Sequence, residues 1–161
     1  MDFFSSACQE PPINEKLFGI CDEENGEKAY TNADDNTKWI ATVNNKKQKE
    51  IIFTAIDKCV IKDYEHQGRG RCDGMLTSSE LIYLVELKNE ARAWITDAIE
   101  QLESTVKFFI ENHDISKFRH KKAFACNKRH QPFKVVDNEL NNRFFRTYGF
   151  RIDVQAEIII I

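Results

Sequence analysis

The chain has few of the residues that interrupt regular structure. Its 161 residues include only 6 glycines and 3 prolines, and 42% of the residues are hydrophobic. This composition excludes a collagen-like, low-complexity or wholly disordered chain, and it provides enough apolar side chains for one sizeable core. Because the length corresponds to about one domain, we predict a single domain over residues 1–161.

The sequence also lacks long apolar runs and paired cysteines. No apolar run reaches the ~18 residues that a membrane-spanning helix needs. The start, MDFFSSAC, has neither the basic nor the apolar region of a signal peptide. The five cysteines are an odd number without a CxxC or other paired spacing, so no disulfide framework is indicated. We therefore predict a cytoplasmic protein with buried, reduced thiols and no membrane partner.

The net charge of −3 excludes a uniformly basic nucleic-acid-binding chain, but the charges are segregated. Residues 1–35 contain nine acidic side chains and two lysines, whereas residues 115–136 contain seven basic side chains and no acidic one. The second segment is either a phosphate-binding strip or a solvated loop, and the first is either a solvated face or a competitor of nucleic acid. The candidate phosphate contacts are Lys117, Arg119, Lys121, Lys122, Lys128 and Arg129.

The order of predicted elements indicates an α/β fold. Asn25-Gly26, between two short apolar runs, predicts a hairpin after an N-terminal arm, and together they form an acidic extension over residues 1–50. The core over residues 51–161 should contain a mixed central sheet flanked by helices, with Asp137 capping the second helix. Its predicted elements are three antiparallel strands, a long helix, a strand, a helix and a strand, at 51–64, 71–77, 81–88, 89–112, 122–127, 138–147 and 150–160.

Three charged residues at the end of the antiparallel strands are the candidate chemical site. Glu86 and Lys88 point to the same face of one strand, since side chains alternate with a period of two. A turn at Ser78-Ser79 places Asp73 diagonally from Glu86 on that face, with backbones about 7–8 Å apart. Two such carboxylates can converge on one hard divalent cation. The alternative is a solvated ion pair between Glu86 and Lys88.

This pattern resembles the PD-(D/E)xK nuclease superfamily, and more closely its uncharacterised bacterial members. The resemblance covers about residues 51–161 and depends on Asp73, the run Glu86-Leu87-Lys88 after a hairpin, and Gln101 on the following helix. Cys72 stands where the family has a proline. Members often carry another acidic residue on an earlier helix, and the sequence does not choose among Glu15, Glu50 and Asp57 for that role.

The resemblance implies a restriction-endonuclease-like fold and a metal-dependent phosphodiester hydrolase acting on nucleic acid, with DNA favoured over RNA. Asp73 and Glu86, with Leu87 between Glu86 and Lys88, would hold Mg²⁺ or Mn²⁺. Lys88 would position or activate the water that the ion holds. Gln101 would touch the active site or the nucleic-acid backbone.

Two other functions remain open on the sequence alone. The first is a catalytically inactive module on the same fold, such as a subunit of a bacterial defence assembly that binds a second copy or a partner protein. The second is a purely structural or immunity-type protein, which the acidic extension would suit. A nuclease or nucleic-acid module should lose affinity for nucleic acid steeply as salt rises, whereas an immunity-type protein should have none to lose.

Overall fold

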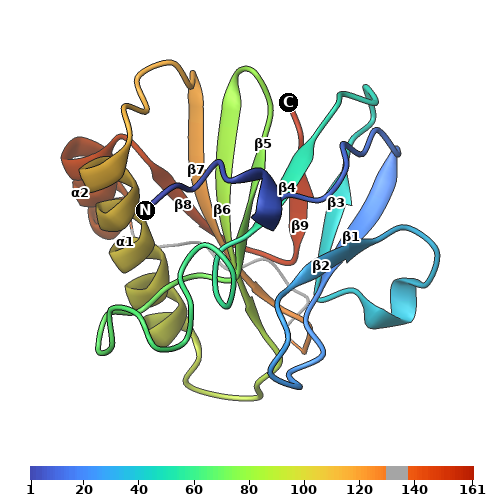
Figure 1. Cartoon of the computed structure of the whole chain (residues 1–161), viewed down its shortest axis with the longest axis horizontal. Coiled ribbons are helices and arrows are strands. Elements are labelled where there is room, and N and C mark those ends of the chain that lie inside the picture. The colour runs from blue at the N-terminus through green and yellow to red at the C-terminus, as the bar shows by residue number, and fades with distance from the viewer. Residues whose placement is uncertain (130–137) are drawn as a thin grey trace.

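The computed structural model describes residues 1–129 and 138–161, which form three layers. A five-stranded sheet lies in the middle, with the helices on one face and a four-stranded sheet on the other (Figure 1). Apolar side chains fill both spaces between the layers. The chain is therefore a mixed α/β protein with two sheets and two α-helices in its described part.

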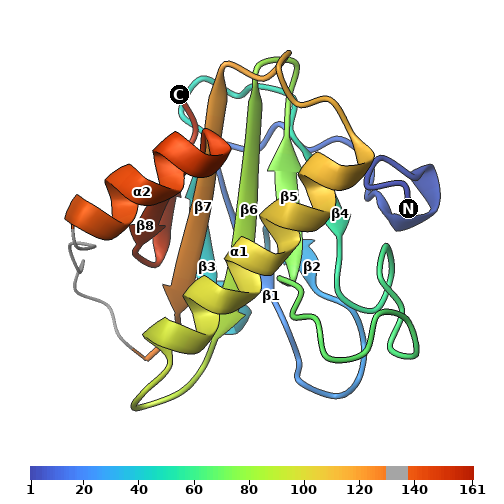
Figure 2. The same ribbon diagram turned by 90° about the vertical axis from the view of Figure 1, so that its left-hand side faces the viewer.

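The middle sheet contains the predicted order of elements. Its first three strands are antiparallel, and the last two run parallel to the third. Each parallel connection passes through a helix, and both helices lie on the same face of the sheet (Figure 2). The strands are, in spatial order, β4 (Ile52–Ala55), β5 (Gly74–Thr77), β6 (Leu81–Lys88), β7 (His120–Asn127) and β8 (Arg151–Val154). The helices are α1 (Ile95–Asn112) and α2 (Asn138–Tyr148).

The second sheet joins the two ends of the chain. Its spatial order is β2-β1-β3-β9, and β9 runs parallel to β3 although more than one hundred residues separate them in sequence. The strands are β1 (Leu17–Cys21), β2 (Tyr30–Asn32), β3 (Ala41–Asn44) and β9 (Glu157–Ile159). Two short 3₁₀ turns, η1 (Ser6–Cys8) and η2 (Asn36–Lys38), lie in the same N-terminal region. Residues 1–50 thus contribute three strands to a sheet that the C-terminal β9 completes.

Strand β6 is the centre of the molecule. Ile82 and Leu84 pack toward the helices, and Tyr83 and Val85 pack toward the second sheet. A strand buried on both faces needs a continuous apolar run, which the sequence provides up to Val85. Its last residues therefore place charged side chains at the edge of a rigid core.

Three predicted elements are shorter than the sequence indicates: β4, α1, and β5, which begins at Gly74 and not at Arg71. β4 ends at Ala55, because the chain leaves the sheet at Asp57 and turns with Lys58 at a φ of +67°. α1 begins at Ile95 and not at residue 89, because Ala93 has a φ of +55°, which a helix does not allow. The predicted cap Asp137 lies outside the described residues, and Gly149 follows α2 with a φ of +77°.

The predicted last strand, over residues 150–160, is divided between the two sheets. β8 ends at Val154 and β9 begins at Glu157, so the chain crosses from one sheet to the other within two residues. Ile152 packs toward the helices, whereas Ile158 packs between the sheets. Apolar and polar residues alternate in the same way in β8 and β9, because each strand buries one of its faces. Both helices lie on one face of the middle sheet, and the second sheet covers the other face.

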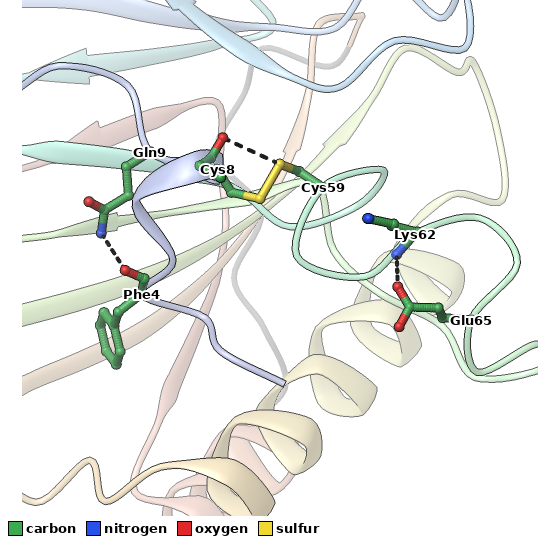
Figure 3. The surroundings of a disulfide bond; sticks show 7 residues. Phe4, Cys8, Gln9, Cys59, Lys62 and Glu65 are labelled. Carbon is green, nitrogen blue, oxygen red and sulfur yellow. Dashed lines mark hydrogen bonds between the residues drawn. A yellow bond between two sulfur atoms is a disulfide. The ribbon is translucent and has the colours of Figure 1, made fainter.

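The N-terminal arm is held along the edge of the middle sheet. Gln9 forms a bridge with Thr54, within β4, and Ile13 forms one with Ile51, just before β4. A disulfide bond joins Cys8 to Cys59, in the loop that follows β4 (Figure 3). The prediction of five reduced cysteines is therefore wrong for this pair, whose members are 51 residues apart and have no local spacing signal.

The other three cysteines agree with the sequence-based expectation. Cys21, Cys72 and Cys126 are free and buried. None of the helices in the described part of the chain has the length and apolar content that crossing a membrane requires.

Candidate functional site

The pairing of β5 with β6 brings Asp73 and Glu86 together. Gly74 lies opposite Val85, and the Asp73 N–H donates to the Val85 carbonyl at 3.1 Å, so Asp73 lies beside the end of β6 that carries Glu86. The sequence predicts Leu84 opposite Asp73, but Leu84 lies opposite Met75. The two-residue turn comes one position later than Ser78-Ser79, because the Ser78 N–H donates to the Leu81 carbonyl at 3.1 Å and leaves Ser79 and Glu80 as the turn. The later turn shifts the register of the two strands by two residues.

Asp73 is fixed by hydrogen bonds to both neighbouring strands. Its carboxylate Oδ2 accepts the Leu87 N–H at 2.7 Å, and its backbone carbonyl accepts the Ile56 N–H at 2.9 Å. Its carboxyl group lies near that of Glu86. Burial raises the pKa of Asp73 to about 7, although the Leu87 N–H opposes this effect. The carboxyl pair therefore retains a proton near neutral pH.

Glu86 is one of the few buried charged residues of the chain. Its exposed fraction is 5%. Its Oε2 lies 3.4 Å from Lys88 Nζ, whereas its Oε1 is buried without a hydrogen-bond partner. Burial, followed by the charge of Asp73, raises the pKa of Glu86 well above its usual value, and Lys88 opposes the shift. The side chains of Glu86 and Lys88 are only 7% and 13% exposed, so their pair is not the solvated surface pair that the sequence left open.

These residues have the chemistry that a hard divalent cation requires. Two enclosed carboxylates face each other, and a buried carboxylate oxygen of Glu86 lacks a partner. Mg²⁺ prefers oxygen ligands and usually keeps several waters, so one or two carboxylates are enough protein ligands. Across residues 1–129 and 138–161, no group of three or more His, Cys, Asp or Glu side chains is placed to hold a metal ion. Leu87 is the third predicted metal residue, and its N–H donates a hydrogen bond to Asp73 Oδ2.

The backbone before Asp73 is positioned by Thr105, which sequence reasoning missed. The Cys72 N–H donates to Thr105 Oγ1 at 2.7 Å, and that hydroxyl donates to the Gln101 carbonyl at 2.9 Å. Thr105 is fully buried. Its signal in the sequence is a hydroxyl within the apolar stripe of a helix, next to Val106.

Gln101 lies beside Gly70 and not beside the carboxyl pair. A Cβ atom added at Gly70 would lie 2.3 Å from Gln101 Oε1, so a larger residue there would displace the end of the Gln101 side chain. The Gln101 Oε1 atom is itself buried without a hydrogen-bond partner. Gln101 is therefore connected to the site through Thr105 and through the loop before Asp73. No hydrogen bond joins Gln101 directly to Asp73 or Glu86.

The three candidates for a further acidic residue lie in different places. Asp57 pairs with Arg71, its Oδ1 lying 3.2 Å from the guanidinium Nε. Glu50 lines a cavity of about 550 Å³ near the β5–β6 turn, at the other end of β6, and Glu15 precedes β1.

The acidic residue that sequence reasoning missed is Asp22, just after β1. The negative charges of Asp22 and Asp57 both raise the pKa of Asp73, with Asp22 the stronger of the two.

The candidate phosphate contacts do not form one continuous strip. Strand β7 pairs with β6 over its whole length, from Leu81 opposite His120 to Lys88 opposite Asn127. An eight-residue strand spans roughly 25 Å. The basic residues divide accordingly: Lys117, Arg119, Lys121 and Lys122 lie before or in the first half of β7, and Lys128 and Arg129 follow its end.

Only the second group adjoins Lys88. The Lys128 N–H donates to the Lys88 carbonyl at 3.0 Å, and Arg129 Nε donates to Asn89 Oδ1 at 3.0 Å. Lys122, in contrast, lies 3.5 Å from Asp153 on β8. Of the candidate phosphate contacts, Lys128 and Arg129, which follow β7, are thus the two that adjoin Lys88 and Asn89.

No family model, curated protein or solved structure matches this chain. The functional conclusion therefore depends on the geometry of the carboxyl pair and its surroundings.

Proposed function

We propose that the chain is a metal-dependent phosphodiester hydrolase that acts on nucleic acid, with DNA favoured, and that it belongs to the PD-(D/E)xK nuclease superfamily. The observation that carries the proposal is the enclosed Asp73–Glu86 pair, with Lys88 3.4 Å from Glu86 and one Glu86 oxygen without a partner. The succession of antiparallel meander, helix, parallel strand, helix and parallel strand supports a restriction-endonuclease-like core.

The residues present determine what each group would contribute. A bound Mg²⁺ or Mn²⁺ would supply charge neutralisation and a water of lowered pKa as nucleophile. Asp73 and Glu86 would hold the ion once their shared proton leaves. Lys88 is close enough to Glu86 to stabilise negative charge that develops on the phosphate oxygens. The buried position of the pair excludes bulk water and strengthens these interactions.

Cleavage of plasmid and of single-stranded DNA with Mg²⁺ or Mn²⁺ tests the proposal. We expect Glu86→Gln and Lys88→Met to reduce the cleavage rate by at least about 100-fold, since each removes a group needed in the transition state. Glu80→Gln, in the β5–β6 turn, is the control and should cleave like the original chain. Cleavage that is equal in all four proteins, or its absence under every condition, would contradict the proposal.

The alternative is a catalytically inactive module on the same fold, including a subunit of a bacterial defence assembly that binds a second copy or a partner protein. The observation that favours it is the placement of Gln101 beside Gly70, away from the carboxyl pair. Such a module needs no metal at Asp73. Calorimetric Mn²⁺ binding that disappears in Asp73→Asn would count against it.

A cytoplasmic location is also part of the proposal, and the disulfide bond is evidence against it. Disulfides persist in oxidising compartments and are rare in the cytoplasm. Three buried free cysteines are compatible with either environment. The redox state of Cys8 and Cys59 in protein taken directly from cells under thiol-blocking conditions would decide the question.

A further inference from the structure

The N-terminal region places acidic side chains beside the ends of β6 and β7. A pocket of about 240 Å³ is lined by Asp22, Glu23 and Glu24 together with Lys38, Asn89 and Lys128. We call the first three residues the acidic tip, which lies between β1 and β2 at the lower edge of the view (Figure 1). Because Asn89 directly follows Lys88, the acidic tip adjoins the edge of the sheet from which Lys88 emerges.

The N-terminal region also binds the side chain of Lys128, a candidate phosphate contact. Lys128 Nζ donates to the Thr37 carbonyl at 2.6 Å, while the Lys128 N–H binds the Lys88 carbonyl. Thr37 belongs to η2, which also lines the pocket. Lys128, which follows β7, therefore gives one of the three donors of its ammonium group to the N-terminal region, and a phosphate would have to compete for it.

Hydrogen bonds hold the acidic tip in place. Asp22 is partly buried, and its Oδ1 accepts the Glu24 N–H at 2.9 Å, which fixes the start of the tip. Glu23 is held by a hydrogen bond from the Tyr30 hydroxyl. The acidic side chains are thus positioned by the fold.

We propose that the acidic tip is a specificity determinant that weakens binding of polyanions at the ends of β6 and β7. This inference rests on the proposed function, because it concerns access of nucleic acid to the same site. The tip repels substrate phosphates, and η2 competes with them for Lys128. A polyanion would therefore bind well only where a divalent cation offsets the negative charge. The salt dependence should show this, since salt screens the repulsion of the tip as well as the attraction of the lysines.

The test compares two variants with the same change in net charge. The first is Asp22→Asn/Glu23→Gln/Glu24→Gln, which neutralises the acidic tip at nearly constant size. The control is Glu15→Gln/Glu50→Gln/Glu80→Gln, whose residues precede β1 or lie near the β5–β6 turn. Fluorescence anisotropy of a labelled single-stranded DNA oligonucleotide is measured in EDTA, where metal-dependent cleavage cannot occur.

At low salt we expect the tip variant to bind the oligonucleotide roughly tenfold more tightly than the original chain, and the control to differ by less than about twofold. The affinity of the tip variant should also fall more steeply with salt. Equal tightening in both variants would mean that net charge alone acts, and would overturn the inference. So would an unchanged affinity in the tip variant.

The outcomes separate this inference from the proposed function. If cleavage depends on Glu86 and Lys88 while the tip variant binds no more tightly, only the inference fails. If no protein binds the oligonucleotide and none cleaves DNA, both fail. Should the triple variant not fold, as judged by its melting temperature, Glu23→Gln/Glu24→Gln leaves Asp22 in place and should still bind about threefold more tightly at low salt.

Discussion

Asp73 Oδ2 accepts the N–H of Leu87 at 2.7 Å, which holds the carboxyl group of Asp73 beside that of Glu86 at one end of the middle sheet. Burial raises the pKa of both, so the folded chain binds protons there more tightly than the unfolded chain does. A pair of this kind is strained at neutral pH unless a proton or a cation lies between its members. The proposed metal ion would offset this repulsion, so the proposed function accounts for a site that lowers stability at neutral pH.

The first prediction concerns the pH dependence of stability without metal. The folded-state pKa of Asp73, about 7, lies above the usual value of 3.8, so its contribution to stability is complete below about pH 4 and is lost as pH rises toward 7. Asp73→Asn removes this loss. We expect the variant to exceed the original chain in free energy of unfolding by on the order of 2 kcal/mol at pH 8, but not at pH 4.

Urea denaturation in EDTA at both pH values measures this difference. Comparison of the two proteins at each pH removes the contribution of the other titrating groups. A variant that is less stable than the original chain by the same amount at both pH values would contradict the assigned environment of Asp73.

The second prediction concerns Thr105 as a positioning residue. Thr105→Val keeps the size of the side chain and leaves the buried Cys72 N–H without its acceptor, which should cost about 1–3 kcal/mol of stability. Thr105→Ser keeps the hydroxyl and should restore most of the loss. Because Cys72 precedes Asp73, the valine variant should also bind Mn²⁺ more weakly, and serine should rescue the binding. Identical Mn²⁺ affinities in both variants would show that Thr105 is only structural.

The third prediction concerns the Cys8–Cys59 disulfide. A thiol reagent should detect no cysteine in the native protein, three after unfolding and five after reduction and unfolding, because Cys21, Cys72 and Cys126 are buried and free. Closing a loop of 51 residues stabilises by about 4 kcal/mol in the chain-entropy account, so Cys59→Ser should lower the free energy of unfolding by up to that amount. A reductant should destabilise the original chain and leave Cys59→Ser unchanged. Five reactive thiols after unfolding alone would rule out the bond.

Local patterns in the sequence predicted the elements whose boundaries depend on local composition. The strand β6 was predicted at its observed bounds, since a continuous apolar run ends abruptly in Glu86 and Lys88. β4 was predicted too long because Val60 and Ile61 continue the β-branched run, while the chain turns for a non-local reason, the pairing of Asp57 with Arg71. Propensity cannot report such a contact.

The candidate site was predictable in its residues and not in its geometry. Asp73, Glu86 and Lys88 could be selected because the side-chain period of a strand fixes their common face. Their separation could not, because it depends on the position of the turn, which is one residue later than predicted. Asp22 could not be selected either, since it reaches the site only through the packing of one sheet on another.

The most direct test of the central claim is calorimetric titration of Mn²⁺ into the original chain, Asp73→Asn, Glu86→Gln and the control Glu80→Gln. The account predicts one ion bound per chain in the original protein and in the control, with affinity that rises from pH 6 to pH 8 as the shared proton leaves. Both site variants should bind at least about tenfold more weakly, since each removes an anionic ligand. Equal binding by all four proteins, or no binding by the original chain at pH 8, would contradict a metal site at Asp73 and Glu86.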